Sequence, residues 1–108
     1  MTNKIIGRFY LKQTSNGNLI GEFSNDHSDK ISTESCDLTS GDNSSNYLGE
    51  YDSTWQEKGE PVFADLKISK AERSSRLFHL EWRRSGALVF EGEGMLCGDI
   101  LIGDYHQA

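Results

Sequence analysis

The sequence predicts an all-β fold: a single antiparallel eight-strand up-and-down (meander) barrel spanning residues 1–108. Three observations indicate it. Apolar and polar residues alternate with a period of two in one segment after another, which is typical of strands that bury one face. Turn-forming residues separate these segments at short intervals. Finally, four stretches at 5–9, 19–23, 47–51 and 101–105 share the order apolar, Ile or Leu, glycine, charged, aromatic.

The turn signals are clusters rich in Ser, Asn, Asp, Gly or Pro, and they lie at 15–17, 41–46, 57–61, 85–86 and 98–99. The strands expected between them lie near 4–13, 18–24, 30–38, 46–56, 61–69, 76–84, 87–96 and 100–106. A chain of 108 residues is long enough for one such core.

The first two strands are expected to form a hairpin. Ser15, Asn16 and Gly17 make a three-residue loop, with glycine at the position that favours a left-handed backbone. This loop pairs Phe9 with Phe23, so that both rings point to the same side of the sheet.

The third strand is the least defined, because it lies in a region rich in Ser, Asn and Asp, residues 24–45, for which a loop is the alternative. Its register is also open. The inward polar residues of this strand are therefore either Thr33 and Ser35 or Ser32 and Glu34.

The fifth strand, PVFADLKIS at 61–69, places its aliphatic side chains on one face. A helix over 66–76 is the main competitor, because the run KAERSSR lacks residues that favour strands.

The last three strands fit together by two further turns. A three-residue loop at 85–87 pairs Trp82 with Phe90, and a two-residue turn at Gly98 and Asp99 joins the final pair. The partners across that final hairpin are then alike on the inward face: Leu96 with Leu101, Gly94 with Gly103, and Gly92 with Tyr105.

The recurring glycine phrase is interpreted as scaffold. Strands of a small barrel coil sharply, and their inward side chains must alternate in size, with an aromatic ring lying across a neighbouring glycine. The small inward positions are Gly7, Gly21, Gly49, Gly92, Gly94 and Gly103. The large ones are Phe9, Phe23, Tyr47, Tyr51, Trp55, Phe78, Trp82, Phe90 and Tyr105.

This pattern resembles the calycin-type barrels, the lipocalin, avidin and fatty-acid-binding group. GRFY at 7–10 looks like the first-strand element of that group, GEY at 49–51 is a second example, and the segment at 91–105 is similar to the last hairpin of small uncharacterised bacterial barrel proteins. The chain differs from lipocalins in its shorter length and in having Phe9 where they have Trp. The resemblance implies binding of small molecules.

An inward pocket is the first candidate site. Tyr51, Ser53, Trp55, Trp82 and Tyr105 are its expected lining, because amphipathic rings offer stacking together with one hydrogen bond each. The alternative is that the nine rings fill the barrel and leave no cavity.

The second candidate lies on the outer face. The registers place His79, Glu93 and Asp104 in one row across the last three strands, and Glu81, Glu91 and His106 in the next. A divalent metal held by His79, Glu93, Asp104, Glu91 and His106 is one hypothesis, and docking of a basic partner is another. A solvated surface with nearby arginines is the alternative.

Composition excludes several classes of function. The net charge of −6 argues against nucleic-acid binding and against an anionic membrane surface. No apolar run approaches the length of a membrane helix, and no secretory signal is evident, so we expect a cytoplasmic protein whose two cysteines stay free. No catalytic constellation or phosphate loop is apparent, so neither an enzyme nor a cofactor is expected.

The function these residues favour is non-enzymatic binding of a small apolar or aromatic ligand by the inward aromatics. The alternative is a protein-interaction module, which could be a homodimer, that uses the outer acidic strand face. Its contact surface could include the outward apolar residues Phe63, Tyr10, Val89 and Ile102.

Overall fold

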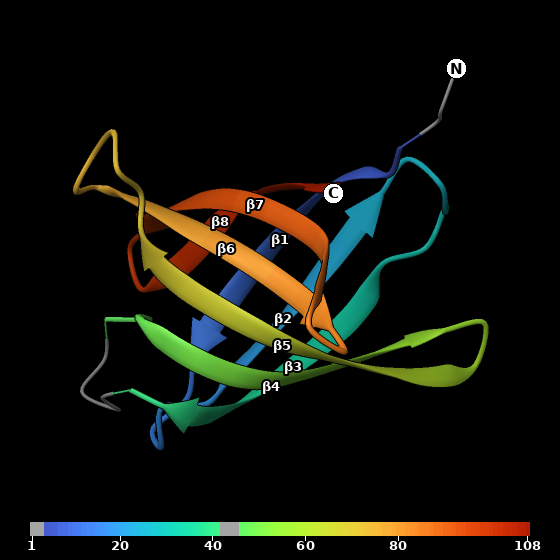
Figure 1. The fold of residues 1–108 in the computed structure, drawn as a ribbon, viewed down its shortest axis with the longest axis horizontal. Helices are drawn as coiled ribbons and strands as arrows, with labels where there is room; N and C mark the ends of the chain where they lie inside the picture. Colours follow the sequence, from blue (N-terminus) through green and yellow to red (C-terminus); the bar gives the residue numbers. More distant parts are fainter. Residues whose placement is uncertain (1–3, 42–45) are drawn as a thin grey trace.

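All eight strands follow one another around a closed antiparallel barrel in the computed structural model, which describes residues 4–41 and 46–108 (Figure 1). They are Ile6–Gln13 (β1), Leu19–Asn25 (β2), Ser32–Ser40 (β3), Gly49–Glu57 (β4), Glu60–Lys70 (β5), Leu77–Arg84 (β6), Ala87–Cys97 (β7) and Ile100–Gln107 (β8). The described residues contain no helix, so the predicted fold class is confirmed. Of the predicted turn at 41–46, residues 42–45 lie outside the described residues.

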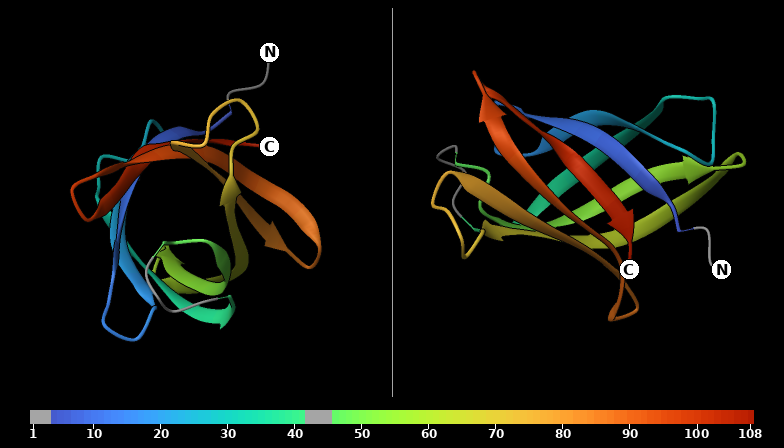
Figure 2. Two further views of the ribbon diagram at one scale, coloured as in Figure 1. Left: turned by 90° about the vertical axis from the view of Figure 1, so that its left-hand side faces the viewer. Right: turned by 90° about the horizontal axis from the view of Figure 1, so that it is seen from above.

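Pairing of β1 with β8 closes the sheet, and Figure 2 shows the two strands beside each other. In this seam Gly7 is opposite Tyr105, and Phe9 is opposite Gly103. A ring therefore faces a glycine twice, as the alternation of large and small inward residues requires.

The predicted registers are confirmed for the pairs Phe9–Phe23, Trp82–Phe90 and those of the final hairpin. The loop between β6 and β7 is different from the prediction. Ser85 and Gly86, both with positive φ, form a two-residue turn, and the register shifts just after Trp82. Two residues with positive φ match the type I′ turn that suits twisted hairpins.

The register shift leaves Val89 as the extra residue of a bulge. Val89 is half-buried and packs against the core, so the prediction that it faces outward is wrong. Tyr10 and Ile102 do lie side by side on the outer surface, whereas Phe63 is exposed on β5, on another part of the barrel.

Loop was the alternative for the third predicted strand, and helix was the alternative at 66–76; the structure has a strand in both regions. Residues 32–40 form β3, with Glu34 and Cys36 buried, and a helix over 66–76 is absent because β5 continues to Lys70. Cys36 is buried and Cys97 is exposed, and both are free thiols.

The barrel interior is filled by the predicted rings. Of the nine, Phe23 and Phe90 are half-buried and the others are buried. At one end, here called the closed end, the Tyr47 hydroxyl accepts the N–H of Gln13 at 3.0 Å and donates to the carbonyl of Asp99 at 2.7 Å. Tyr47 thereby joins β1 to the β7–β8 turn across the barrel.

The inward glycines allow strands to approach closely, and the obstacle to a side chain differs among them. A Cβ at Gly7 would lie 2.5 Å from the ring of Tyr105, as the ring-over-glycine interpretation predicts, and also 2.5 Å from the backbone carbonyl oxygen of Ser24. A Cβ at Gly103 would instead collide with the backbone carbonyl of Glu93, which cannot move aside without breaking the sheet. At Gly94 the nearest atom would be 3.0 Å away.

We therefore predict that Gly103→Ala destabilises the protein by about 2–3 kcal/mol, and Gly94→Ala by about 1 kcal/mol. Ser35→Ala, at an exposed position on β3, should change stability by less than about 0.5 kcal/mol. Denaturant unfolding of the three variants measures how much unfolding free energy each one loses. Equal losses at Gly103 and Gly94 would contradict the close backbone approach.

Candidate functional site

The end of the barrel opposite Tyr47, here called the open end, contains a cavity of about 50 Å³. The β2–β3, β4–β5 and β6–β7 connections lie at this end, together with the start of β1 and the end of β8 (Figure 1). The cavity is lined by Ile5, Phe9, Phe23, Asn25, Glu34, Trp55, Glu57, Trp82, Phe90 and Tyr105. This volume holds a few water molecules or a small polar group, and it is smaller than the roughly 150 Å³ cavity that accepts benzene.

The carboxyl group of Glu34 is the buried polar group of this cavity. Its Oε2 accepts the indole N–H of Trp82 at 2.8 Å and the hydroxyl of Ser53 at 2.5 Å. The thiol of Cys36 donates to the same oxygen at 3.7 Å. Three donors from β3, β4 and β6 thus hold one oxygen and fix the orientation of the carboxyl.

The second oxygen of Glu34, Oε1, is reachable from the cavity. Among the described residues no hydrogen bond is made to Oε1, and no fully buried side-chain oxygen or nitrogen lacks a partner. Because Glu34 itself lines the cavity, Oε1 must be the atom that is open to it. The cavity therefore offers an incoming group one unpaired carboxyl oxygen.

Burial raises the pKa of Glu34 above its ordinary value, although the hydrogen bonds from Ser53, Trp82 and Cys36 oppose this change. Burial also raises the pKa of the Cys36 thiol well above its ordinary value, and the negative charge of Glu34 adds to that effect. Cys36 is accordingly a neutral donor to Glu34 and not a reactive thiolate.

Four rings above the carboxyl contact one another in a closed cycle. The ring centroids are 6.2 Å apart for Phe23 and Trp55, 6.3 Å for Trp55 and Phe90, 5.5 Å for Phe90 and Tyr105, and 6.1 Å for Tyr105 and Phe23. Each contact is edge-to-face, the arrangement that aromatic quadrupoles favour. All four rings line the cavity.

Two polar side chains complete the lining. Glu57 accepts the indole N–H of Trp55 at 3.3 Å, and Asn25 donates to the hydroxyl of Tyr105 at 3.0 Å. Among the residues that the structure describes, no Lys, Arg or His lines the cavity. The charged groups of the cavity are therefore both carboxyls.

Of the five residues predicted to line the pocket, three line the cavity and two do not. Trp55, Trp82 and Tyr105 line the cavity, as predicted. Ser53 is buried behind it and reaches it only through Glu34. Tyr51 lies deeper, where its hydroxyl donates to the carbonyl of Tyr47 at 2.8 Å, so Tyr51 is not part of the lining.

Sequence reasoning did not select Glu34, although it named Glu34 as one of two inward alternatives. Cys36 and Leu38 are the apolar residues of β3, and they share a face with Glu34 because residues two apart point the same way. Their spacing was the signal that could have resolved the register.

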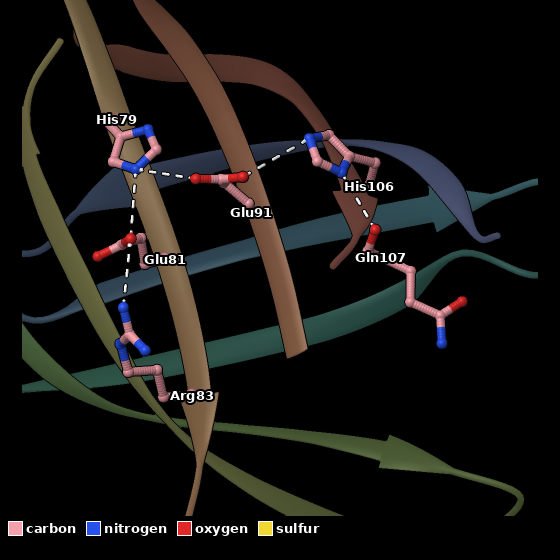
Figure 3. Close-up of polar contacts among 6 residues, drawn as sticks. All are labelled: His79, Glu81, Arg83, Glu91, His106 and Gln107. Carbon is pink, nitrogen blue, oxygen red and sulfur yellow. Dashed lines mark hydrogen bonds and ion pairs between the residues drawn. The ribbon is translucent and has the colours of Figure 1, made fainter. Parts of the chain in front are cut away.

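On the outer face, five charged or ionisable side chains form a chain across β6, β7 and β8, here called the outer cluster (Figure 3). His79 Nε2 lies 3.3 Å from Glu91 Oε2 and 3.5 Å from Glu81 Oε2. His106 Nε2 is 4.0 Å from Glu91, and Arg83 is 3.3 Å from Glu81. The outer cluster consists of His79, Glu81, Arg83, Glu91 and His106.

The predicted backbone rows are confirmed, since His79 is opposite Glu93 and Glu91 is opposite His106. The side chains pair differently from the rows. His79 contacts Glu91 diagonally, and Glu93 forms an ion pair with Arg73 from the β5–β6 connection. Much of the acidic charge is thereby compensated within the chain itself.

For the metal hypothesis, the structure brings together a smaller set than predicted. Among the described residues, donor atoms of His79, Glu81 and Glu91 lie within 4.8 Å of one another, whereas the predicted ligands Glu93, Asp104 and His106 do not join them. Glu93 pairs with Arg73 instead, and Glu81, which was not among the predicted ligands, belongs to the set. One imidazole and two carboxylates are ligands that Zn²⁺ accepts.

No protein-family model matches the chain, and no curated protein or solved structure matches it either. Within residues 4–41 and 46–108, no helix is long and apolar enough to cross a membrane.

We predict that Zn²⁺ perturbs the NMR signals of His79 before those of the loop residue His27, which lies 3.8 Å from a single carboxylate, Asp26. His79→Gln should weaken Zn²⁺ binding at least about tenfold, the loss that even outer-shell partners of a metal cause. His27→Gln is the matched control and should have no effect. Equal perturbation of both histidines would contradict a site at the outer cluster.

Proposed function

We propose that this protein is a non-enzymatic binding protein that takes a small ligand, or the small end of a larger one, into the open end of its barrel. The observation that carries the proposal is the cavity itself, which is lined both by a ring cycle of Phe23, Trp55, Phe90 and Tyr105 and by one oriented carboxyl. Ligand sites are concave and mostly apolar, with a small number of polar groups that fix orientation.

The size of the cavity limits what enters it. About 50 Å³ accepts a group of two or three heavy atoms, so the rest of the ligand would extend outward past Phe23 and Phe90. These two rings are half-buried, unlike the fully packed rings below them. They provide an apolar surface for an aliphatic or aromatic body.

Two features support a binding role over catalysis. Ser53, the hydroxyl closest to Glu34, is buried and does not line the cavity, so it has no access to a substrate. Cys36 is held as a neutral thiol in the same interior. A nucleophile would need both access and activation.

The closed eight-strand meander is the architecture of calycin-type barrels, and we propose kinship with that group on the strength of architecture and cavity together. Fold alone does not define function, so the proposal depends on the cavity. We also place the protein in the cytoplasm, because its free cysteines fit a reducing compartment.

The alternative, a protein-interaction module on the outer acidic face, has less support. Arg73 and Arg83 already pair with Glu93 and Glu81, which lowers the attraction for a basic partner. The outward apolar residues are also dispersed, since Phe63 lies apart from Tyr10 and Ile102.

Phe90→Leu should weaken binding of a small aromatic ligand by about 1 kcal/mol, roughly fivefold in Kd, because it opens the ring cycle. Phe63→Leu makes the same change on the outer surface, where the side chain is 64% exposed, and should leave Kd unchanged. Quenching of tryptophan fluorescence in a ligand titration measures both, since Trp55 and Trp82 line the cavity. Equal Kd values for the two variants would contradict binding at the open end.

A further inference from the structure

The cavity at the open end is negative as well as aromatic, and this combination selects a class of ligand. Its ionisable carboxyls are Glu34 at the base and Glu57 in the lining, and no Lys, Arg or His accompanies them there. We propose that the cavity binds an organic ammonium ion, with an N–H of the ammonium donating to Oε1 of Glu34. This inference rests on the proposed function, because it names the chemistry of the ligand for the same cavity.

The unpaired oxygen of Glu34 defines where the ammonium lies. Oε2 is saturated by donors from Trp82 and Ser53, so the carboxyl cannot rotate to bring another lone pair into the cavity without losing them. Oε1 is left as an acceptor with no donor among the described residues. An ammonium supplies both the missing hydrogen bond and a compensating charge.

The ring cycle supplies the second part of cation recognition. Because adjacent centroids of Phe23, Trp55, Phe90 and Tyr105 are at most 6.3 Å apart, a point central to the cycle lies within about 6 Å of all four. That is the distance at which a cation that lies over the face of an aromatic ring is attracted to it. Unlike a second carboxylate, an aromatic ring attracts a cation without carrying a strongly hydrated charge of its own.

Desolvation explains why a cation is preferred over a neutral group. A buried carboxylate is unfavourable unless it is paired, and none of its three donors carries a positive charge. An ammonium next to Oε1 removes this deficit, whereas a neutral hydroxyl supplies only a hydrogen bond. An anionic ligand would be repelled by both carboxyls.

The volume of the cavity specifies the head of the ligand. About 50 Å³ accommodates a CH₂–NH₃⁺ group, while a bulky quaternary ammonium would require the rings to separate. The ligand class is therefore a primary amine on a short methylene, with an apolar or aromatic body that packs against Phe23 and Phe90 at the mouth.

The test compares three probes that share one ring: benzylammonium, benzyl alcohol and benzoate, at neutral pH and constant ionic strength. Titrations are followed by tryptophan fluorescence and by the indole N–H signal of Trp82 in NMR spectra. We expect benzylammonium to bind at least about tenfold more tightly than benzyl alcohol, and benzoate not to bind. The Trp82 signal should shift, because its N–H donates to Glu34.

Two variants test whether Glu34 is the source of the preference for benzylammonium. Glu34→Gln keeps acceptors for Trp82 and Ser53 but removes the charge, so it should abolish the preference for benzylammonium over benzyl alcohol. Glu50→Gln is the matched control at an exposed carboxyl of β4 outside the cavity, and it should retain the full preference. Circular dichroism and NMR spectra establish that both variants are folded.

The outcomes separate this inference from the proposed function. If benzylammonium and benzyl alcohol bind the wild-type protein equally, the inference is overturned while the proposed function stands. If none of the three binds, both are overturned. These comparisons use the wild-type protein, so they decide the inference even if Glu34→Gln fails to fold.

Discussion

Closure of the sheet by β1 and β8 is the constraint on which the rest of the structure depends. Once the sheet is closed, every second residue of every strand must enter one shared interior, and none of them can turn back to solvent. The same rule that buries Leu11, Leu80 and Leu101 also buries Glu34. A carboxyl in a hydrophobic interior is therefore a consequence of the topology and of the β3 register, and it requires the donors that surround it.

The two ends of the barrel differ in how their inward polar groups are hydrogen-bonded. At the closed end, Tyr47 is buried and its hydroxyl is hydrogen-bonded to the backbone of Gln13 and Asp99. At the open end, Glu34 keeps one oxygen free within a small cavity, beneath rings that contact one another. The interactions of Tyr47 at the closed end are therefore structural, and the open end holds the cavity for which ligand binding is proposed.

Much of the fold could be predicted because the strands of this chain alternate clearly. The run RLFHLEWR, for example, shows which residues of β6 face the interior. The bulge at Val89 could not be predicted, because a two-residue turn plus one bulged residue uses the same number of residues as the predicted three-residue loop. Trp55, Trp82 and Tyr105 were found from period-two patterning, whereas Glu34 was left open because β3 is mostly polar. The contact of Arg73 with Glu93 depends on a loop conformation that no periodicity encodes.

The most direct test of this account is the titration of the Glu34 carboxyl carbon by NMR, combined with the stability of the wild-type protein relative to Glu34→Gln across pH. Because the folded-state pKa of Glu34 is raised by burial, its stabilising contribution should be complete below its ordinary pKa of 4.5 and be lost as pH rises through the folded-state value. Each pKa unit of elevation corresponds to about 1.4 kcal/mol lost to the wild type relative to Glu34→Gln. A Glu34 that titrates at 4.5 with no pH-dependent difference between the two proteins, or below 4.5 with a difference of the opposite sign, would contradict a carboxyl whose pKa is raised by burial in the barrel.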